Sequence, residues 1–469
     1  MTAREMVWDA LSEVNEAGGM CHKVLAEALS KSTLTEADRA FATRLFHGTL
    51  ERQITLDTVI AASAGRPVSK IKPRVLELLR LSAYQLLFLK SVPVSAACNE
   101  AVSMAKRRGL AGLSGFVNGV LRGLARRISA CGGTQEFLAD TAATMSYEEA
   151  LCFRYAVPAW LAALWKRDFP ETDIETMLAA TLGEGAVTIR LNESRATMEE
   201  LVASLTAEGA DVKPGALPNC LRIGGSGNPG RYRAYADGWF SVQDESAVLA
   251  GNLLPLSAGM HVLDICAAPG GKTVHAADRL TKLAAEHPEA SEFAVEARDV
   301  SAAKLPAILE QLARVGLSGV TCREADASVY DPALAEWADV VIADVPCSGL
   351  GVLRRKPDGK TKTKPEDIPA LAAMQREIVA QAVRYVKPGG YLAYSTCTVN
   401  RAENASIAAF IADELGLVPV DLRGKLPEEL RESAYQRSGQ RPDGIQIFPE
   451  AGKWDGFYIA GFRKPAEQK

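Results

Sequence analysis

The chain has 469 residues, and a domain size of roughly 150 residues predicts about three domains. Hydrophobic residues make up 48% and charged residues 23% of the sequence, which excludes fibrous, low-complexity and disordered chains. The formal net charge of -4 excludes a protein that coats polyanions with its whole surface, although one region can still be basic.

Neither a membrane span nor a signal peptide is predicted. The most apolar window, residues 76–89, is interrupted by Arg80 and Gln85, whereas a spanning helix needs roughly 18 or more apolar residues. The N-terminal MTAREMVWDA lacks the apolar core of a signal peptide. The nine cysteines form no C-x-x-C pair, which argues against a structural zinc site and a disulfide framework. We expect a cytoplasmic protein with free thiols and no metal.

The N-terminal part, residues 1–135, is predicted to be an all-α domain. From Glu5 to Arg127 apolar residues recur at helical spacing, with helices expected over 71–90, over 96–107 and from Ser114 onward. Turn residues separate these segments, at Gly18-Gly19, Gly65-Arg66-Pro67 and Ser91-Val92-Pro93.

The same domain carries a local excess of positive charge that the net charge hides. Between residues 66 and 127 the only acidic residues are Glu77 and Glu100. The basic residues there are Arg66, Lys70, Lys72, Arg74, Arg80, Lys90, Lys106, Arg107, Arg108, Arg122, Arg126 and Arg127. This charge fits either a phosphate-binding surface or an ordinary solvated helical face.

Residues 136–235 are predicted to form a linker and a small, RRM-like α/β module. Val187–Leu191 and Cys220–Ile223 have the composition of strands, and Met198–Ala207 has that of a helix. A glycine-rich stretch, residues 224–230, predicts a loop after the second strand.

From residue 236 to the C-terminus, strands alternate with helical stretches. The predicted strands are residues 262–266, 293–296, 340–344 and 391–395. This alternation predicts a parallel, doubly wound α/β sheet built with right-handed crossovers. Ligands of such sheets bind at the carboxyl ends of the strands.

The first of these strands runs into a tight small-residue loop and a helix. The loop residues are Cys266, Ala267, Ala268, Pro269, Gly270, Gly271 and Lys272. Backbone N–H groups in such a loop can approach an anionic ligand at the helix N-terminus. A phosphate-binding P-loop is disfavoured because Cys266 stands where its first glycine belongs, and a G-x-G-x-x-G motif is absent.

Acidic residues follow the next strands. Asp299 ends the second strand, where a carboxylate can accept hydrogen bonds from ribose hydroxyls. Asp326 ends the third strand. The alternative for each is a helix cap, but their position beside the glycine loop favours a nucleoside ligand.

Two cysteines follow the last two strands of the predicted sheet. Cys347 lies in Asp344-Val345-Pro346-Cys347-Ser348-Gly349, and Cys397 lies in Ser395-Thr396-Cys397-Thr398. Neighbouring parallel strands place both thiols in one crevice. A single such cysteine is ordinarily a small buried hydrophobe, whereas two at equivalent strand ends favour chemistry.

The residues from Val242 onward resemble the RNA cytosine-5 methyltransferases of the Nol1/Nop2/Sun family. The resemblance rests on the two cysteine motifs and on Asp264-Ile265-Cys266-Ala267-Ala268-Pro269-Gly270-Gly271-Lys272-Thr273. Gly115-Phe116-Val117-Asn118-Gly119-Val120-Leu121-Arg122 is similar to the NusB-type RNA-binding helical domain. This combination is typical of the Sun branch, which methylates 16S rRNA, and the resemblance covers nearly the whole chain.

The resemblance implies a role for each residue. Cys397 is the nucleophile that attacks carbon 6 of cytosine, and Cys347 assists loss of the carbon 5 proton and enzyme release. S-adenosyl-L-methionine lies across Cys266–Lys272, with Asp299 on its ribose and Asp326 near its adenine. Asp344 belongs to the cofactor pocket and can also bind the cytosine ring. DNA cytosine methyltransferases use a Pro-Cys cysteine for attack, so Cys347 as nucleophile is the alternative.

The expected partner is 16S rRNA, naked or in an early small-subunit particle, bound by a monomer. Besides the helical domain, the basic residues Arg354, Arg355, Lys356, Lys360, Lys362 and Lys364 are expected to contact phosphate. In Pro357-Asp358-Gly359 a glycine replaces the bulky residue usual after this aspartate in the family. Transfer RNA or large-subunit rRNA are alternative substrates, and a non-catalytic assembly or antitermination factor is the alternative function.

Overall fold

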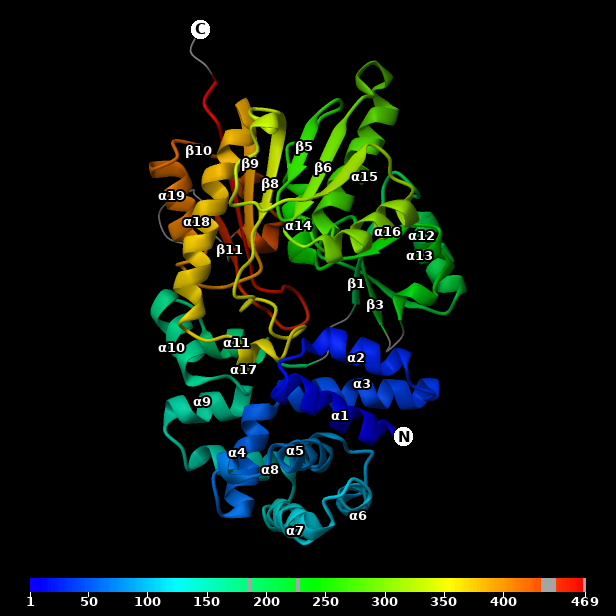
Figure 1. The fold of residues 1–469 in the computed structure, drawn as a ribbon, viewed down its shortest axis with the longest axis vertical. Helices are drawn as coiled ribbons and strands as arrows, with labels where there is room; N and C mark the ends of the chain where they lie inside the picture. The colour runs from blue at the N-terminus through cyan, green and yellow to red at the C-terminus, as the bar shows by residue number, and fades with distance from the viewer. Residues whose placement is uncertain (184–186, 225–227, 432–443, 467–469) are drawn as a thin grey trace. The chain divides into compact units, whose positions relative to one another are not determined.

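The computed structural model describes residues 1–183, 187–224, 228–431 and 444–466, and it forms two compact units (Figure 1). The helical unit comprises Met1–Arg167, Asp173–Glu184 and Leu353–Thr363. The α/β unit comprises Asp168–Thr172, Gly185–Val352 and Lys364–Lys469. Residues 225–227 of the predicted glycine-rich loop lie outside the described residues. The predicted domain boundaries at residues 135 and 235 stay predictions.

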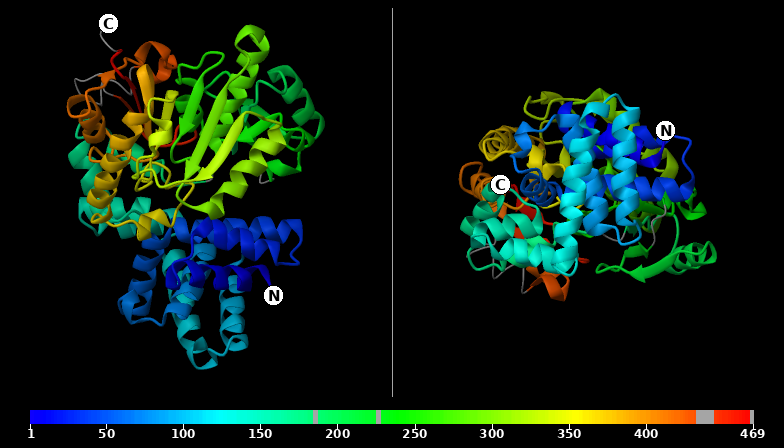
Figure 2. Two further views of the ribbon diagram at one scale, coloured as in Figure 1. Left: turned by 45° about the horizontal axis from the view of Figure 1, so that its top comes forward. Right: turned by 90° about the horizontal axis from the view of Figure 1, so that it is seen from below.

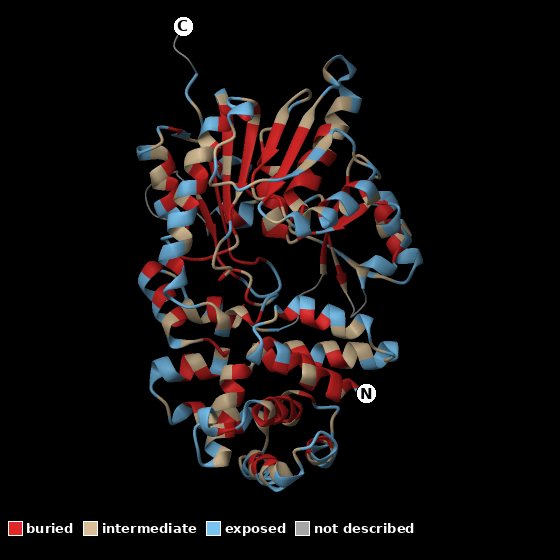
Figure 3. Ribbon diagram, in the orientation of Figure 1, coloured by how far each residue is buried: buried red, intermediate tan, exposed pale blue. Residues whose placement is uncertain are grey.

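The helical unit confirms the predicted N-terminal all-α domain. Its helices are α1 (Ala3–Glu16), α2 (Cys21–Ser30), α3 (Glu36–Glu51), α4 (Gln53–Ala64), α5 (Pro73–Phe88), α6 (Val94–Arg107), α7 (Ser114–Ala130), α8 (Thr134–Ala143), α9 (Tyr147–Tyr155), α10 (Ala159–Asp168) and α11 (Ile174–Ala179). Helix α5 begins with Pro73 in its first turn, where a missing N–H costs no hydrogen bond. It is buried along most of its length and forms the centre of the unit's core (Figure 3). Helices α5, α6 and α7 run side by side (Figure 2).

The α/β unit contains a small antiparallel sheet, which includes the two predicted strands and two further ones. Its strands are β1 (Val187–Leu191), β2 (Asp211–Pro214), β3 (Cys220–Gly224) and β4 (Phe240–Val242), in the order β2-β3-β1-β4. Helix α12 (Met198–Ala207) covers one face through Leu201 and Leu205. A capping box between Thr197 and Glu200 starts this helix by satisfying its free N–H groups.

The second sheet is the predicted doubly wound one. Its strands are β5 (His261–Asp264), β6 (Ala294–Asp299), β7 (Val320–Glu324), β8 (Ala338–Asp344), β9 (Val386–Thr396), β10 (Val418–Pro419), β11 (Ile445–Ile447) and β12 (Phe457–Arg463). The order is β10-β12-β9-β8-β5-β6-β7, with β11 paired to β12. Strands β7, β6, β5, β8 and β9 are parallel to one another, whereas β12 runs antiparallel to β9. The sheet is therefore mixed.

Helices cover both faces of this sheet, which explains its continuous apolar strands. Helices α18 (Asp367–Tyr385) and α19 (Ala405–Asp413) pack against Leu263 and Val341. Helices α15 (Gly271–Glu286) and α16 (Leu305–Val315) pack against the alternate residues, Val262 and Val340 (Figure 2). The remaining helices are α13 (Arg233–Ala236), α14 (Glu245–Asn252) and α17 (Gly359–Lys362).

Among the described residues, no helix combines the length and apolar character needed to cross a bilayer. The same residues contain no cluster of three or more His, Cys, Asp or Glu side chains arranged to hold a metal ion.

Candidate active site

The candidate site lies where the strand order of the large sheet reverses. Strand β5 pairs with β6 on one side and with β8 on the other: the chain runs from β5 through β6 to the edge strand β7 and then crosses back to β8 on the opposite side of β5. The carboxyl ends of these strands diverge at such a point and leave a crevice for a ligand. Asp264, Asp299 and Asp344 end β5, β6 and β8, and Cys397 directly follows β9.

The predicted glycine loop folds onto the end of strand β6. The Ala267 N–H donates to Arg298 O at 2.8 Å, and the Ala268 N–H donates to Asp299 Oδ2 at 3.2 Å. Gly270 caps helix α15 with a φ of 104°, a conformation that residues with a Cβ rarely adopt. The loop therefore presents the first turn of α15 at the carboxyl edge of the sheet.

The two acidic residues predicted to bind the nucleoside differ in their surroundings. Asp299 is 6% exposed and accepts hydrogen bonds from the N–H groups of Ala268 and Ser301, so it holds the loop in shape. Asp326 is exposed, and its Oδ1 accepts hydrogen bonds from the N–H and hydroxyl of Ser328. These two bonds lower the pKa of Asp326. Their predicted contacts with the ribose and adenine stay predictions.

Lys272 and Asp344, both predicted site residues, form an ion pair of 2.7 Å. Ser395 Oγ donates to the other Asp344 oxygen at 2.7 Å, which joins the ends of strands β8 and β9. Lys272 Nζ also lies 4.9 Å from the centre of the Phe457 ring. Lys272 and Ser395 thus orient the Asp344 carboxylate, one at each oxygen.

Asp264 is a member of the site that the sequence did not single out. It is 1% exposed; its Oδ2 accepts from Thr273 Oγ1 at 2.7 Å, and its Oδ1 has no hydrogen-bond partner among the described residues. Burial, helped by the charge of Asp344, raises the pKa of Asp264 to about 7. Burial and the neighbouring carboxylates also raise the pKa of the Cys266 thiol. Asp264 could have been recognised by its position, because it ends an apolar strand in the same way as Asp299 and Asp344 do.

The structure brings the two predicted catalytic cysteines together. Cys347 Sγ and Cys397 Sγ lie 3.4 Å apart, within hydrogen-bond distance for sulfur. Their hydrogen bond, followed by burial and the nearby charges, raises the pKa of Cys347 well above its usual value. Either sulfur can donate in this hydrogen bond, and the raised pKa of Cys347 favours Cys347 as the donor.

Polar residues behind the thiols were missed in the sequence. Glu403, Gln375 and Asn400 are each fully buried and are linked by hydrogen bonds. The run Asn400-Arg401-Ala402-Glu403-Asn404 follows Cys397 closely, which could have drawn attention to it. Polar residues directly before an apolar helix are ordinarily expected at the protein surface. Here they are buried, and the partners that satisfy them belong to the cysteine loops.

In the basic cluster after Cys347, Lys360 is buried, whereas the predicted phosphate contacts of Arg354, Arg355, Lys356, Lys362 and Lys364 stay predictions. The segment Leu353–Thr363 belongs to the helical unit, and Lys360 is 2% exposed. Lys360 Nζ donates to Glu51 O at 3.4 Å and Tyr155 O at 3.2 Å, and burial lowers its pKa to about 7. Lys362 pairs with Asp358 at 3.2 Å and donates to Gly19 O. The prediction was wrong for Lys360, because its ammonium group is used inside the protein.

The residues around Gly359 pack within the helical unit. Asp358 Oδ2 accepts from the Cys21 N–H at 3.2 Å, at the first turn of helix α2. A Cβ on Gly359 would lie 2.9 Å from Leu353 Cδ2, the end of a flexible side chain.

The basic band of the helical unit is partly neutralised. Arg80 is 7% exposed and pairs with Asp57 and Glu77. Arg74 and Arg108 both pair with Asp9. Eight exposed basic residues of the band have no carboxylate within ion-pair distance among the described residues. Three of them make other contacts: Arg66 and Arg127 lie over aromatic rings, and Arg122 donates to Asn118. The other five are Lys70, Lys72, Lys90, Lys106 and Arg126.

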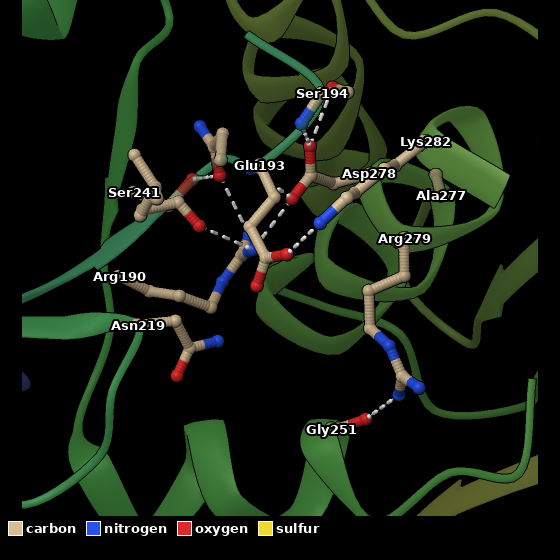
Figure 4. A network of polar contacts seen from close by, with 12 residues as sticks. Arg190, Glu193, Ser194, Asn219, Ser241, Gly251, Ala277, Asp278, Arg279 and Lys282 are labelled. Atoms are coloured by element: carbon tan, nitrogen blue, oxygen red, sulfur yellow. Dashed lines mark hydrogen bonds and ion pairs between the residues drawn. The ribbon is translucent and has the colours of Figure 1, made fainter. Parts of the chain in front are cut away.

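A buried polar network joins the small sheet to helix α15 (Figure 4). Arg190 on β1 pairs with Asp278 on α15 at 3.0 Å, and both side chains are at most 1% exposed. Asp278 also accepts from the N–H groups of Glu193 and Ser194 and from the Ser194 hydroxyl. These contacts hold strand β1 of the small sheet against helix α15.

The sequence matches known protein families along most of its length. Residues 252–463 match the family described as 16S rRNA methyltransferase RsmB/F, residues 1–126 match the NusB family, and residues 157–228 match a ferredoxin-like domain of RsmF/B-like methyltransferases. The fold is similar to the crystal structure of PH0851, with a TM-score of 0.78, 22% identity and 99% of both chains covered. It is also similar to NSun6 from Pyrococcus horikoshii, with a TM-score of 0.53, 19% identity, 66% of this chain and 98% of that chain covered.

Full-length relatives agree with these matches. The chain is 33% identical to the probable ribosomal RNA small subunit methyltransferase B of Bacillus subtilis, with 99% of both sequences covered. It is 32% identical to the ribosomal RNA small subunit methyltransferase B of Vibrio cholerae, with 99% of this chain and 98% of that protein covered. With identity above 30% across both units, and with paired thiols at a methyltransferase-type strand crevice, the chain belongs to the 16S rRNA methyltransferase RsmB/F family.

Proposed function

We propose that the protein methylates carbon 5 of one cytosine in 16S rRNA, using S-adenosylmethionine and a covalent intermediate on Cys397. The observation that carries the proposal is the 3.4 Å pair of Cys347 and Cys397 beside the carboxyl ends of β8 and β9. A binding protein has no use for two such thiols. The family membership supports the rRNA substrate.

The residues at the crevice fit the proposed cofactor. Its sulfonium supplies an activated methyl group, so no metal is needed. The loop Cys266–Lys272 and the carboxylate of Asp299 would hold its nucleoside end, as a short loop at a helix N-terminus and a strand-end carboxylate do in other nucleoside sites. Asp264 Oδ1, buried and without a partner among the described residues, is a free acceptor for an ammonium group. Asp326 would lie near the adenine.

Carbon 5 of cytosine is too weak a nucleophile to take a methyl group unaided. The Cys397 thiolate would add to carbon 6, forming an S–C bond and moving the electrons of the 5,6 double bond to carbon 5. Asp344, held by Lys272 and Ser395, would bind the cytosine ring as its electron density changes. After carbon 5 is methylated, its proton would pass to a base with the assistance of Cys347. The electron pair of that C–H bond would re-form the 5,6 double bond, and the S–C bond would break with its electron pair returning to the Cys397 sulfur.

The hydrogen bond between the thiols supports this division of roles. The proton on Cys347 can be donated to the sulfur of Cys397, which stabilises the thiolate form of Cys397 before attack. In the alternative, Cys347 attacks, but its raised pKa makes its thiolate scarce at neutral pH.

The target base must be unpaired or flipped out, because a stacked base cannot expose its faces to a thiolate and a sulfonium. We propose that Lys70, Lys72, Lys90, Lys106 and Arg126 of the helical unit contact rRNA phosphates, with the protein acting as a cytoplasmic monomer. Converting all five to Gln should flatten the salt dependence of RNA binding, by up to about 0.9 in slope for each lost contact. Arg74→Gln with Arg108→Gln is the matched control, because these arginines are already paired with Asp9.

The experiment that tests the reaction is methyl transfer from labelled S-adenosylmethionine to unmodified small-subunit rRNA, with the product mapped by bisulfite sequencing. One protected cytosine is expected. Cys397→Ser should lower methyl transfer by at least about 1,000-fold without weakening cofactor binding. Cys131→Ser, at the end of helix α7, is the matched control.

Other outcomes of this experiment are equally informative. Transfer only to transfer RNA or large-subunit rRNA would keep the chemistry and change the substrate. No transfer to any RNA would favour a non-catalytic assembly or antitermination factor. Full activity of Cys397→Ser together with an inactive Cys347→Ser would assign the attack to Cys347.

A further inference from the structure

Glu403 is a fully buried carboxylate at the base of the two cysteine loops. Its Oε1 accepts from Asn400 Nδ2 at 2.6 Å and from the Ser348 hydroxyl, and its Oε2 accepts from the Ser348 N–H at 2.9 Å and from Gln375 Nε2 at 2.9 Å. All four donors are uncharged. Burying a carboxylate costs free energy, and buried carboxylates are found where several donors satisfy them. Apolar side chains would fill this space at a lower cost, so the cluster indicates a role other than packing.

The cluster holds the chain on both sides of Cys347. Gln375, on helix α18, donates through the same nitrogen to Pro346 O at 2.8 Å and to Glu403. Glu403 in turn receives the N–H and the hydroxyl of Ser348. The residue before Cys347 and the residue after it are therefore fixed by one hydrogen-bonded group, which leaves the Cys347 backbone little freedom to rotate.

The loop of Cys397 is joined to the same cluster. Ser348 Oγ lies 2.7 Å from Thr398 Oγ1, and the Gly351 N–H donates to Cys397 O at 3.0 Å. A Cβ on Gly351 would lie 1.9 Å from Gly456 O, so this approach requires glycine. The two loops are thus attached to each other directly beside each thiol.

We infer that Glu403 is a positioning residue that holds the Cys347 loop against the Cys397 loop and orients the Cys347 thiol for release of the covalent intermediate. The inference rests on the proposed function, in which Cys347 acts after methyl transfer. It adds that the step depends on a buried carboxylate whose hydrogen bonds go to Ser348, Gln375 and Asn400 rather than to either thiol.

The substitution Glu403→Gln separates positioning from bulk packing. It keeps the size of the side chain, but one of its two terminal groups becomes an amide NH₂ that faces N–H and O–H donors instead of accepting from them. The anchoring of Ser348 is weakened while the surrounding apolar residues keep their places.

The experiment compares trapped protein–RNA adduct on a denaturing gel for wild type, Cys347→Ala, Glu403→Gln and the double variant, all in the full chain. Under the proposed function Cys347→Ala accumulates adduct. We expect Glu403→Gln to accumulate adduct as well, at least about 10-fold above wild type, and the double variant to trap no more than Cys347→Ala alone. Affinity for S-adenosylmethionine should change less than about twofold.

A pH measurement adds a readout that a packing defect would not change. The charge of Glu403 is one of the groups that raise the pKa of Cys347. Removing that charge lowers the pKa of Cys347, so the dependence of adduct release on pH should move to lower pH in Glu403→Gln. Glu414→Gln, beyond the end of helix α19 and paired with Arg376, is the matched control and should leave the profile in place.

The outcomes are distinguishable. If Cys347→Ala traps adduct and Glu403→Gln releases it like wild type, the inference is wrong and the proposed function stands. If Cys347→Ala traps nothing, the role of Cys347 in the proposed function is wrong. Should Glu403→Gln not fold, Ser348→Ala removes the hydroxyl contacts alone; it should trap adduct, and wild-type release by that variant would refute the inference.

Discussion

Lys272 Nζ lies 2.7 Å from Asp344 Oδ2, which joins the first turn of helix α15 to the end of strand β8. Lys272 is 8% exposed and is the last residue of the predicted cofactor loop. The ion pair therefore connects the part of the crevice assigned to the cofactor with the part assigned to the cytosine. A substitution of Lys272 therefore changes the position of Asp344, and a substitution of Asp344 changes the position of Lys272.

Lys272→Met should weaken binding of S-adenosylmethionine by about 10-fold or more, because a hydrogen bond to a charged group is worth about 1.5–3 kcal/mol. Asp344 would lose its cation and its fixed orientation. Isothermal titration calorimetry measures the effect. Lys282→Met is the matched control, since Lys282 lies on the same helix and its pair with Glu193 is partly exposed. Equal affinities for both variants would contradict the assignment.

Asp264 should make stability depend on pH. Its pKa is raised from an ordinary acidic value to about 7 in the folded protein, so the folded state binds the proton more tightly than the unfolded state. The contribution of protonated Asp264 to the free energy of unfolding is therefore fully present below about pH 4 and is lost as the pH rises through 7. Asp264→Asn should remove this loss, on the order of 4 kcal/mol at pH 8.

Thermal unfolding between pH 5 and 8 checks this expectation. The melting temperature of Asp264→Asn should rise relative to wild type as the pH increases. Asp211→Asn, an exposed residue of strand β2, serves as control and should follow wild type. A constant difference between Asp264→Asn and wild type over this range would show that Asp264 does not titrate there.

Lys360 should give a pH dependence in a higher range. Burial lowers its pKa from 10.5 to about 7, so the unfolded state binds the proton more tightly. Stability should rise as the pH increases from 7 toward 10, and Lys360→Met should remove a cost on the order of 5 kcal/mol at pH 7. Chemical denaturation at pH 7 and pH 9 measures it, with the exposed Lys356→Met as control. A variant less stable than wild type at pH 7 would contradict the expected sign.

Arg190→Met should destabilise the α/β unit by about 3 kcal/mol, because it leaves the buried Asp278 carboxylate without its cation. Asp278 keeps three other donors, so the effect should lie at the low end for a broken buried pair. Urea unfolding followed by circular dichroism measures it. Lys213→Met, which breaks an exposed pair with Asp211 on the same sheet, should change stability by less than about 1 kcal/mol.

Sequence and structure agree best where the pattern is local. The helices over 73–88 and 94–107 and the strand Val187–Leu191 follow from apolar periodicity, which reports which face of an element is buried. The order of strands β5, β6, β8 and β9 along the chain likewise implied a doubly wound sheet and a crevice at the strand ends. The motifs at those ends identified the paired cysteines and the glycine loop.

Other features are not encoded locally. Glu403 and Asp264 read as ordinary acidic residues in the sequence, and Lys360 as one more cation in a basic stretch. Their burial depends on partners 9 to more than 300 positions away, such as Thr273, Ser348 and Glu51.

The sequence by itself determined the fold class, the order of the elements and the residues with the right chemistry at the strand ends. These depend on periodicity and residue type, which are properties of short segments. Only the tertiary structure decided which charges are exposed and which are buried and paired, and how far apart the two thiols lie. The physical reason is that desolvation and hydrogen-bond satisfaction depend on neighbours brought together by the whole fold.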